Sequence, residues 1–464
     1  MKKKIIFITI ESVKRELDSK TLLALKALKR NYRVVIGQKG ALREFIKDTN
    51  PGIMILKSFG PKNTTHIDFI KKNNFKIVSS DEELVTAVDF EDKVEYRLNN
   101  ENLSKLDIYL CMGETSDYPI LKKKFNSIIK NVLVCGNIRL ELLKKNYRKL
   151  LEKDSEVLKN KFGKYILFLT GFAHINKYRV NSEIDFIYSR IVNENIDPDS
   201  HHIYLINEQV KMQREILLQS LKFLNNFEKN FPGINLVISP HPNEKIEFWE
   251  NYINKKKFKN IFINKDIHSS SYSLINSSEM LISCNSTSLL EAFFLKKKVI
   301  NLLGKKTRVS EIELLKKITK VVRSSDELSE TIKDLEKTEN KKIFHQELKE
   351  IKNFEENFDS FKAILDKLDK LENVDLYNSL FKNNYHFVIS QFRKYKNYIK
   401  WIISSIIHKN ALHHILHQSK IGARLKKNFF INNTNHINSL EKVENLKIKQ
   451  IVHEVFLLDS LNKF

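Results

Sequence analysis

The chain has 464 residues, more than one ordinary hydrophobic core accommodates, so we expect two domains and an appendage. Its formal net charge of +24 favours anionic partners, but the lysines are spread along the whole chain and no nucleic-acid-binding motif is present, which argues against nucleic acid. Cys111, Cys135 and Cys284 have no metal-ligand spacing, which is typical of buried thiols in a reducing compartment and not of a disulfide framework or a metal site.

Residues 1–150 predict a first Rossmann-like domain. Its first apolar run, Ile5 to Ile10, ends at Glu11 and no small-residue cleavage site follows, so we expect a strand, not a signal peptide, and a protein that stays in the cytoplasm. Helical patterns such as Ser19 to Arg30 separate this run from the next ones. The further apolar runs suit buried parallel strands, and they are Tyr32 to Ile36, Met54 to Leu56, Lys76 to Val78, Ile108 to Cys111 and Asn131 to Cys135.

An acidic triplet follows the strand that ends at Val78. Carboxylates that open a helix usually complement its dipole, and Ser80 with Glu83 has the spacing of a capping box. The functional alternative is that Asp81 or Glu82 acts as a general base across a cleft from the second domain. Both interpretations stay open at this point.

Residues 151–340 predict a second domain, beginning with the strand Tyr165 to Leu169. A later strand, Asn235 to Ser239, runs into Pro240, His241 and Pro242. The prolines stiffen the loop and hold the imidazole at the carboxyl end of the strand, where it could donate to a phosphate or to a departing nucleotide oxygen. A histidine with a structural role is the alternative.

The segment from Ile282 to Leu302 is the most informative part of the chain, because a short strand runs through polar residues directly into a helix. The polar residues are Asn285, Ser286 and Thr287. They would cap the helix, whose first N–H groups and positive dipole end favour a phosphate or a carboxylate. Glu291, four residues after Thr287, could accept hydrogen bonds from a pair of sugar hydroxyls. An ordinary helix cap is the alternative.

The remaining residues predict a linking helix over 341–371 and a basic amphipathic helical tail over 372–464. Residues 381–430 contain ten Lys or Arg residues, no Asp or Glu, and interleaved aromatic residues such as Trp401. No run reaches the roughly 18 apolar residues that span a bilayer. This pattern favours the anionic face of a membrane as a partner, with a packed helical bundle as the alternative.

These motifs occur in the order seen in the bacterial surface carbohydrate biosynthesis protein family, which the chain resembles over about residues 1–310. The first motif has the long pattern Glu-x-x-x-Arg-Glu-Leu-Asp, and the chain departs from the family at Ser239 (Arg), Leu84 (Gly) and Ile138 (Pro). The segments that carry the resemblance are Ile10 to Ala24, Val35 to Gly37, Gly52 to Lys57, Asp81 to Glu83, Tyr96-Arg97, Gly136 to Arg139, Pro240 to Pro242 and Ser286 to Ala292.

The resemblance implies a GT-B-like fold: two Rossmann-like doubly wound domains facing a cleft, here followed by a helical C-terminal region. A weaker likeness to transferases of CMP-activated 2-keto sugars, such as sialyltransferases, implies roles for individual residues. Asp81 or Glu82 would be the base on the glycan acceptor, His241 would meet the donor phosphate, and Ser286 with Thr287 would bind that phosphate.

We therefore expect a cytoplasmic, membrane-peripheral glycosyltransferase of capsule or lipopolysaccharide assembly, which moves a sugar from a nucleotide-sugar onto a surface polysaccharide or lipid-linked glycan without a metal or other cofactor. The helix terminus at Ser286 would neutralise the leaving phosphate. Glu11, Arg15, Glu16 and Asp18 would lie where the glycan acceptor enters, or form only a capping and salt-bridge cluster. The alternatives are a nucleotide-sugar 2-epimerase of the same fold and an inactive scaffold protein.

Overall fold

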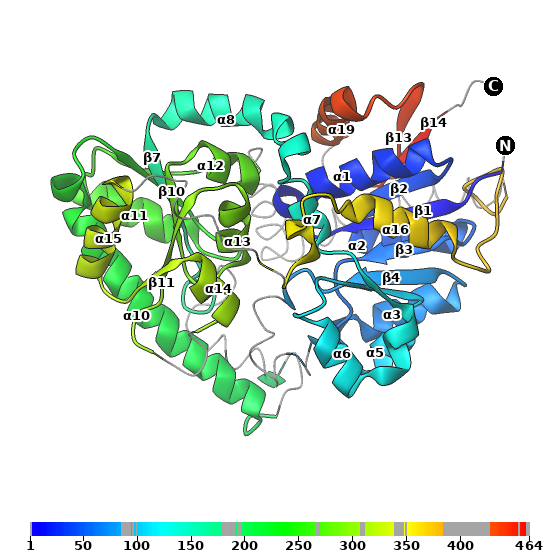
Figure 1. Cartoon of the computed structure of the whole chain (residues 1–464), viewed down its shortest axis with the longest axis horizontal. Helices are drawn as coiled ribbons and strands as arrows, with labels where there is room; N and C mark the ends of the chain where they lie inside the picture. Colours follow the sequence, from blue (N-terminus) through cyan, green and yellow to red (C-terminus); the bar gives the residue numbers. More distant parts are fainter. Residues whose placement is uncertain are drawn as a thin grey trace, which may run out of the picture. The chain divides into compact units, whose positions relative to one another are not determined.

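A computed structural model of the chain describes residues 2–84, 94, 97–98, 100–177, 187, 191–192, 197–265, 270–306, 311–337, 348, 350–383, 427–452 and 455–460. The chain forms two compact units (Figure 1). Unit 1 contains Met1–Leu84, Lys93–Leu142 and Leu348–Phe464, and unit 2 contains Val85–Asp92 and Leu143–Glu347. Each unit has its own largely parallel sheet with helices packed against it, which confirms the predicted α/β fold class.

Unit 1 is built on an eight-stranded sheet in the order β13-β14-β2-β1-β3-β4-β5-β6. The six strands from β2 to β6 pair in parallel, and β1, β3 and β5 are buried along their whole length, as continuous apolar runs predict. The bounds are β1 Ile5–Ile10, β2 Arg33–Gln38, β3 Ile53–Leu56, β4 Lys76–Ser80, β5 Ile108–Cys111, β6 Val132–Val134, β13 Leu446–Val452 and β14 Val455–Ser460.

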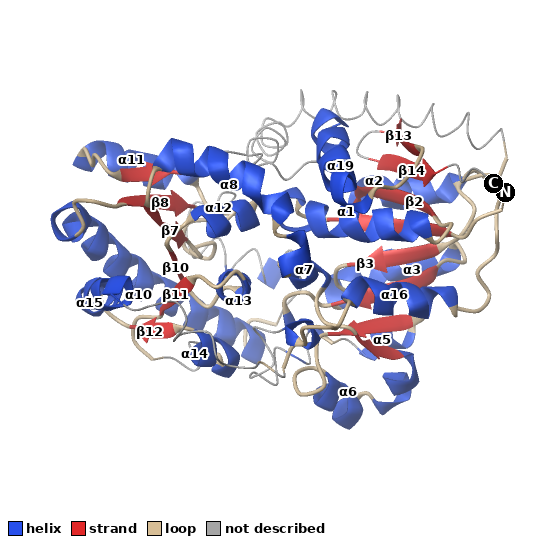
Figure 2. Cartoon of the chain, turned by 45° about the horizontal axis from the view of Figure 1, so that its top comes forward, coloured by secondary structure: helices blue, strands red, loops and turns tan. Residues whose placement is uncertain are grey.

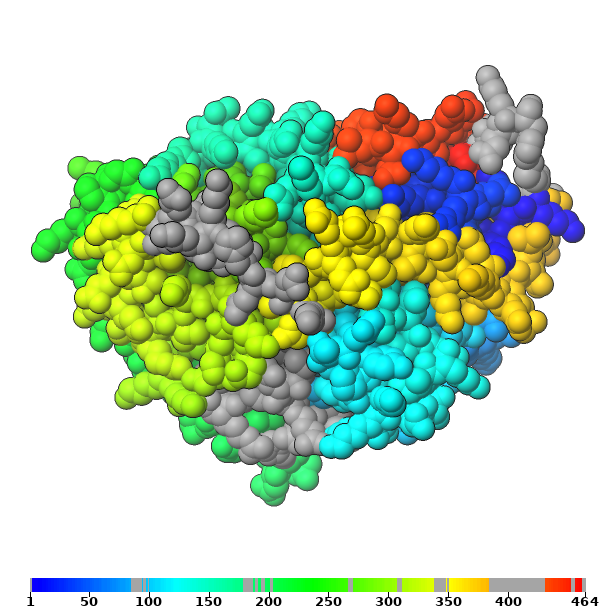
Figure 3. All heavy atoms as spheres, in the orientation of Figure 1, coloured from blue at the N-terminus to red at the C-terminus, as the bar shows by residue number. Residues whose placement is uncertain are grey.

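The helices of unit 1 include elements from both ends of the chain. α1 (Val13–Lys29) packs against β1 and β2, and α16 (Ser360–Asp369) and α19 (Lys427–Glu441) lie beside it (Figures 2 and 3). The other α-helices described in this unit are α2 Lys39–Phe45, α3 Thr64–Lys72, α5 Asn100–Ser104, α6 Tyr118–Lys124 and α7 Ile138–Glu141.

The C-terminal part of unit 1 differs from the sequence-based expectation. Of the helix expected over residues 341–371, the described residues contain only α16, preceded by a 3-10 turn at Lys352–Phe354. The buried Asn353 side chain explains the break, because it accepts from the N–H of Asn137 (2.6 Å) and donates to Glu141 (2.9 Å). Residues 372–464, expected to be helical, contain α19 but also the antiparallel pair β13 and β14, which extends the sheet from β2.

Unit 2 has a six-stranded parallel sheet in the order β12-β11-β10-β7-β8-β9. Numbered along the chain and read from β9, this is the 3-2-1-4-5-6 order of dinucleotide-binding folds. The strand bounds are β7 Tyr165–Leu169, β8 Asn235–Ser239, β9 Ile261–Ile263, β10 Met280–Ser283, β11 Lys298–Leu302 and β12 Lys320–Val322.

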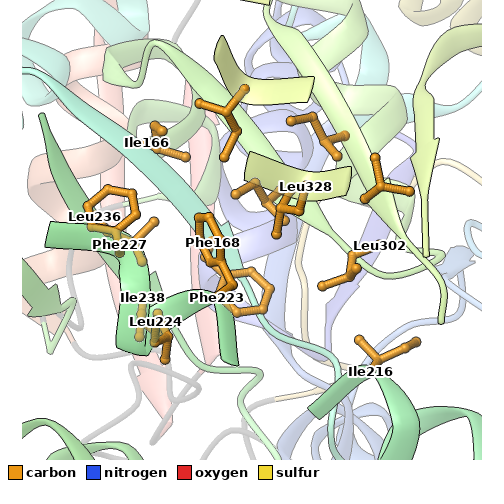
Figure 4. Close-up of a cluster of buried hydrophobic side chains, with 14 of the residues drawn as sticks. Ile166, Phe168, Ile216, Phe223, Leu224, Phe227, Leu236, Ile238, Leu302 and Leu328 are labelled. Carbon is orange, nitrogen blue, oxygen red and sulfur yellow. The ribbon is translucent and has the colours of Figure 1, made fainter. Parts of the chain in front are cut away.

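A large apolar cluster forms the core of unit 2 (Figure 4). Phe223 and Phe227 of α10 lie in it with Phe168 of β7 and Leu236 of β8. This packing fixes the strands whose carboxyl ends carry the motifs of interest. The α-helices described in unit 2 are α8 Lys149–Phe162, α10 His201–Asn230, α11 Ile246–Lys256, α12 Ser271–Ser277, α13 Thr287–Phe294, α14 Glu313–Ile318 and α15 Ser325–Lys337.

In the part of the chain that the structure describes, no helix is both long and apolar enough to cross a bilayer. The basic segment 381–430 lies outside the described residues over positions 384–426. Its predicted membrane role therefore stays a prediction.

Candidate functional site

The first candidate site lies at the point of unit 2 where the strand order changes direction. β7 is the first strand of the unit, β8 lies on one side of it and β10 on the other. The Ser283 hydroxyl donates to the Leu169 carbonyl (2.9 Å), and a Cβ on Gly171 would lie 3.7 Å from the carbonyl oxygen of Cys284. The loops after β7 and β10 therefore run side by side at the carboxyl edge, where ligands bind in open sheets of this order.

The start of α13 forms one side of this edge. Ser286 is the N-cap residue, and its hydroxyl accepts from the N–H of Ser288 (3.2 Å). Asn285 has a positive φ of 44° and is held by the buried Asn301 of β11 through two bonds, its N–H donating to Oδ1 (2.9 Å) and its Oδ1 accepting from Nδ2 (3.1 Å). The expected cap is present, and Thr287 begins a helix whose positive dipole end lies at the switch point.

Glu291 is only 1 % exposed within α13. Only a ligand that packs directly against the small exposed part of this side chain could place a sugar hydroxyl next to its carboxylate. Its predicted role in sugar binding stays a prediction.

Glu244 is the residue of this site that sequence reasoning did not single out. It is 2 % exposed, and burial raises the pKa of its carboxyl although four hydrogen bonds lower it in part. Its oxygens accept from the Thr170 hydroxyl (2.7 Å), the Phe172 N–H (2.9 Å), the His241 N–H (3.3 Å) and the Trp249 indole N–H (3.1 Å). One carboxylate thus ties the loop after β7 to the loop after β8. The only sequence signal for the role of Glu244 was its position three residues after His241, in a loop with two prolines.

His241 follows β8, between Pro240 and Pro242. Its Nδ1 accepts from the N–H of Asn243 (3.1 Å), so the neutral ring carries its proton on Nε2 and can donate from that atom. The prolines and Glu244 fix the loop backbone, and the Asn243 contact fixes the tautomer. The imidazole is therefore presented next to β7 at the same edge as Ser286.

The second candidate site lies at the corresponding point of unit 1, between β1 and β3 in the order β2-β1-β3. Lys57 follows β3, and its Nζ lies 3.3 Å from Glu83, 3.5 Å from Glu16 and 3.9 Å from Glu11. Burial alone would lower the pKa of Lys57, but the carboxylates of Glu83 and Glu16 raise it above its usual value. The ammonium group is therefore held charged among three carboxylates from three different segments.

Three of the four residues predicted on the glycan acceptor side belong to this cluster. Glu16 accepts from the N–H groups of Glu11 (3.1 Å) and Ser12 (3.0 Å), and Arg15 pairs with Glu83 (3.4 Å). These three residues therefore form a capping and salt-bridge cluster, and their role toward a glycan acceptor stays a prediction. Asp18 does not join them, because its carboxylate accepts from Asn433 of α19 (2.7 Å).

Asp81 and Glu82 have different surroundings, although they are neighbours after β4. Asp81 is held by two parallel bonds from Arg97 (2.6 and 2.7 Å) and accepts from the N–H of Glu83 (3.1 Å). Glu82 is 2 % exposed and forms an ion pair with Lys20 (3.6 Å). Burial raises the pKa of Glu82, which the charge of Lys20 only partly offsets. The pairing of Lys57 with Glu16 and Glu83, of Arg97 with Asp81 and of Lys20 with Glu82 could not be assigned from the sequence, because each joins residues well apart along the chain.

Among the described residues, no three or more His, Cys, Asp or Glu side chains are grouped so that they could hold a metal ion.

Comparison with known proteins gives matches in structure and none in sequence. No family model matches the chain, and no curated protein matches it. The Staphylococcus aureus MnaA-UDP co-structure matches with a TM-score of 0.50 and 14 % identity, covering 80 % of this chain and 98 % of that chain. Methanocaldococcus jannaschii UDP-GlcNAc 2-epimerase, in complex with UDP-GlcNAc and UDP, matches with a TM-score of 0.51 and 13 % identity, covering 79 % and 99 %.

The Neisseria meningitidis UDP-GlcNAc 2-epimerase bound to UDP-GlcNAc matches with a TM-score of 0.50 and 14 % identity, covering 79 % of this chain and 100 % of that chain. At such identities the likeness establishes a shared fold. The chain thus has the predicted GT-B-like fold of two Rossmann-like domains.

Proposed function

We propose that the chain is a nucleotide-sugar enzyme, and specifically a metal-independent glycosyltransferase of surface polysaccharide synthesis. The observation that carries the proposal is the carboxyl edge of β8, β7 and β10 in unit 2, where a fixed histidine donor and a capped helix start lie on either side of β7. The nucleotide phosphate binds at the start of α13, at Asn285, Ser286 and Thr287. The membrane surface, reached through residues 381–430, supplies the lipid-linked glycan.

In this reaction the bond between the sugar carbon and the donor phosphate oxygen breaks, and a bond from that carbon to a glycan hydroxyl oxygen forms. The helix dipole, the Ser286 hydroxyl and the Nε2–H of His241 stabilise the charge that develops on the leaving phosphate. The hydroxyl proton passes to a carboxylate of unit 1, either Asp81 or Glu82. A CMP-activated 2-keto sugar is the donor that the motif resemblance favours.

A nucleotide-sugar 2-epimerase is the second candidate. The observation that favours it is that the structures described above are named for UDP-GlcNAc 2-epimerases or for a complex with UDP, and match over about four fifths of the chain. An epimerase needs no glycan acceptor, so the two candidates differ in what the reaction requires.

The test is turnover by the purified full chain with UDP-GlcNAc and with CMP-activated 2-keto sugars, each with and without a lipid-linked glycan, followed by mass spectrometry and NMR of the products. A transferase releases the nucleotide and extends the glycan only when both substrates are present. Conversion of UDP-GlcNAc at carbon 2 without a glycan would establish the epimerase instead. Absence of turnover and of nucleotide binding would leave an inactive scaffold protein.

A further inference from the structure

The charged residues at the carboxyl edge of unit 1 form a cluster that is partly open to solvent. We call Glu11, Arg15, Lys39, Lys57 and Glu83 the unit 1 charge cluster. Their side chains are between 12 % and 33 % exposed, so each can reach a bound molecule. They come from the ends of β1, β2 and β3, from α1 and from the turn after β4, which places them at the switch point of this sheet.

Each cation of this cluster already has a carboxylate partner. Lys39 lies 3.2 Å from Glu11, Arg15 lies 3.4 Å from Glu83, and Lys57 lies 3.3 Å from Glu83. The buried Glu16 adds a further carboxylate 3.5 Å from Lys57. With Glu16 included, three cations face three carboxylates, so the cluster alternates in sign and has no excess of positive charge.

This pairing selects against a charged ligand. A phosphate or carboxylate would approach Lys57 through the field of three carboxylates and would gain only by displacing one of them. A hydroxyl group meets no such opposition, because it donates to a carboxylate and accepts from an ammonium group at the same time. A surface of alternating charges is therefore suited to a molecule with several neighbouring hydroxyl groups.

A buried carboxyl lies beside the cluster. Glu82 is 2 % exposed, and neither of its carboxylate oxygens has a hydrogen bond among the residues that the structure describes. It is joined to the cluster through Lys20, which lies 3.6 Å from Glu82 and 2.7 Å from Glu16. Buried polar atoms are nearly always hydrogen-bonded, so a hydrogen-bond partner of this carboxyl lies beyond the residues that the structure describes.

We propose that the carboxyl edge of unit 1 binds an uncharged, hydroxyl-rich ligand, whose hydroxyl groups bridge Glu11, Lys57 and Glu83. The identification of this ligand as a neutral sugar of the glycan acceptor rests on the proposed function. The site itself does not, because it is carried by unit 1 alone. A chain with a net charge of +24 would thus have a second substrate that is neutral.

The experiment measures binding to the full chain by saturation-transfer NMR and calorimetry. The probes are neutral methyl glycosides and disaccharides, compared with the uronic acid and sugar phosphate of the same stereochemistry. We expect at least one neutral sugar to bind, with an affinity that changes less than about twofold when salt rises tenfold, since no ion pair with the ligand is screened. The matching uronic acid should bind on the order of tenfold more weakly.

Glu83→Gln should weaken neutral sugar binding by about tenfold or more, because it removes a hydrogen bond to a charged group. Glu44→Gln is the control, since Glu44 is also a lysine-paired carboxylate of unit 1 (2.8 Å from Lys47) but lies outside the cluster. Thermal melting of both variants checks folding. Tighter, salt-sensitive binding of the uronic acid or phosphate would overturn the proposal, and so would binding of no neutral probe. Nucleotide binding is measured on the same samples. If the unaltered chain binds no nucleotide, that result contradicts the proposed function and leaves the sugar site in unit 1 unaffected.

Discussion

Glu16 and Glu82 show how two buried carboxyl groups around one lysine acquire opposite acid strengths. Both are no more than 2 % exposed, and Lys20 lies 2.7 Å from Glu16 and 3.6 Å from Glu82. Burial would raise the pKa of Glu16, but Lys20, Lys57 and hydrogen bonds lower it to about 2. Burial raises the pKa of Glu82. Carboxyl groups whose pKa values are driven apart in this way are candidates for different roles, and Glu82 is the one suited to exchange a proton.

The stability of the protein should report this difference as a function of pH. The folded-state pKa of Glu82 exceeds its ordinary value of 4.5, so its contribution is complete below that value and is lost as pH rises through the folded-state pKa. Glu82→Gln stays neutral, so its melting temperature relative to the unaltered chain should increase between about pH 5 and pH 8. Thermal melting across this range checks the expectation. A constant difference would show that Glu82 is ionised throughout.

Glu16→Gln should behave in the opposite sense. The pKa of Glu16 is lowered, so its stabilisation is present above its ordinary value of 4.5 and is lost as pH falls toward about 2. The substitution leaves Lys20 without its 2.7 Å partner in a buried position, which should cost about 3 to 5 kcal/mol of unfolding free energy at neutral pH. Urea unfolding at neutral pH and at about pH 3 measures this, and the deficit should shrink at the lower pH.

Glu244→Gln should loosen the loop that carries His241. The amide cannot accept from all four donors, because its NH₂ group would meet either the Trp249 indole N–H or the N–H groups on the other side. We expect a loss of about 1 to 3 kcal/mol in unfolding free energy and weaker nucleotide binding. Glu247→Gln, at an exposed position of helix α11, which begins two residues after Glu244, is the control. Unchanged nucleotide affinity in Glu244→Gln would remove the positioning role.

Local sequence patterns predicted the roles of single residues, but they did not predict long-range contacts. The N-cap role of Ser286 could be predicted because a hydroxyl residue directly before an apolar helix usually caps that helix. The contacts of Glu244 with Thr170 and of Lys57 with Glu16 join residues far apart in sequence, so no spacing announces them. Asp18 was grouped with Glu16 by spacing alone, yet its partner is Asn433 of α19.

At the scale of elements, the contribution of the α13 N-cap to nucleotide binding can be measured separately from its contribution to the stability of unit 2. Ser286→Ala should destabilise unit 2 by about 0.5 to 2 kcal/mol, the usual cost of losing an N-cap. Ser270→Ala removes the N-cap of α12, whose hydroxyl accepts from Ser273 (3.1 Å), and should cost a similar amount. Only Ser286→Ala, alone or with Thr287→Ala, should weaken nucleotide binding in calorimetry. Equal nucleotide affinity in the two N-cap variants would reduce α13 to an ordinary capped helix.

The strands were predictable where they are buried on both faces. The continuous apolar runs of β1 and β3 leave one interpretation, whereas β13 alternates apolar residues with Lys447 and Lys449 at the edge of the sheet. In a strongly basic region such an alternation is easily taken for an amphipathic helix. The break before α16 was hidden for another reason, because it depends on the buried contacts of Asn353.

At the scale of the whole molecule, both ends of the basic segment are fixed on unit 1. At its start, Phe381 bridges Thr49, and Tyr377 just before it bridges Lys3. Its end runs into α19, which is followed by the pair β13 and β14. A chain that ended near residue 371 would therefore lose part of the sheet of unit 1 together with the segment. A test of membrane binding has to keep these elements and change only the charges between them.

The variant with Arg393, Lys394, Lys396 and Lys400 replaced by Gln meets this condition. Each cation near an anionic surface contributes about 1 kcal/mol, so removing four should weaken binding to anionic vesicles on the order of a thousandfold. Salt should loosen the unaltered chain without releasing it fully, because the apolar contribution of Trp401 is not screened. Co-sedimentation measures both effects, with neutral vesicles and a variant neutralised at Lys447 and Lys449 of β13 as controls. Equal sedimentation of all three proteins would favour a packed helical bundle over a membrane contact.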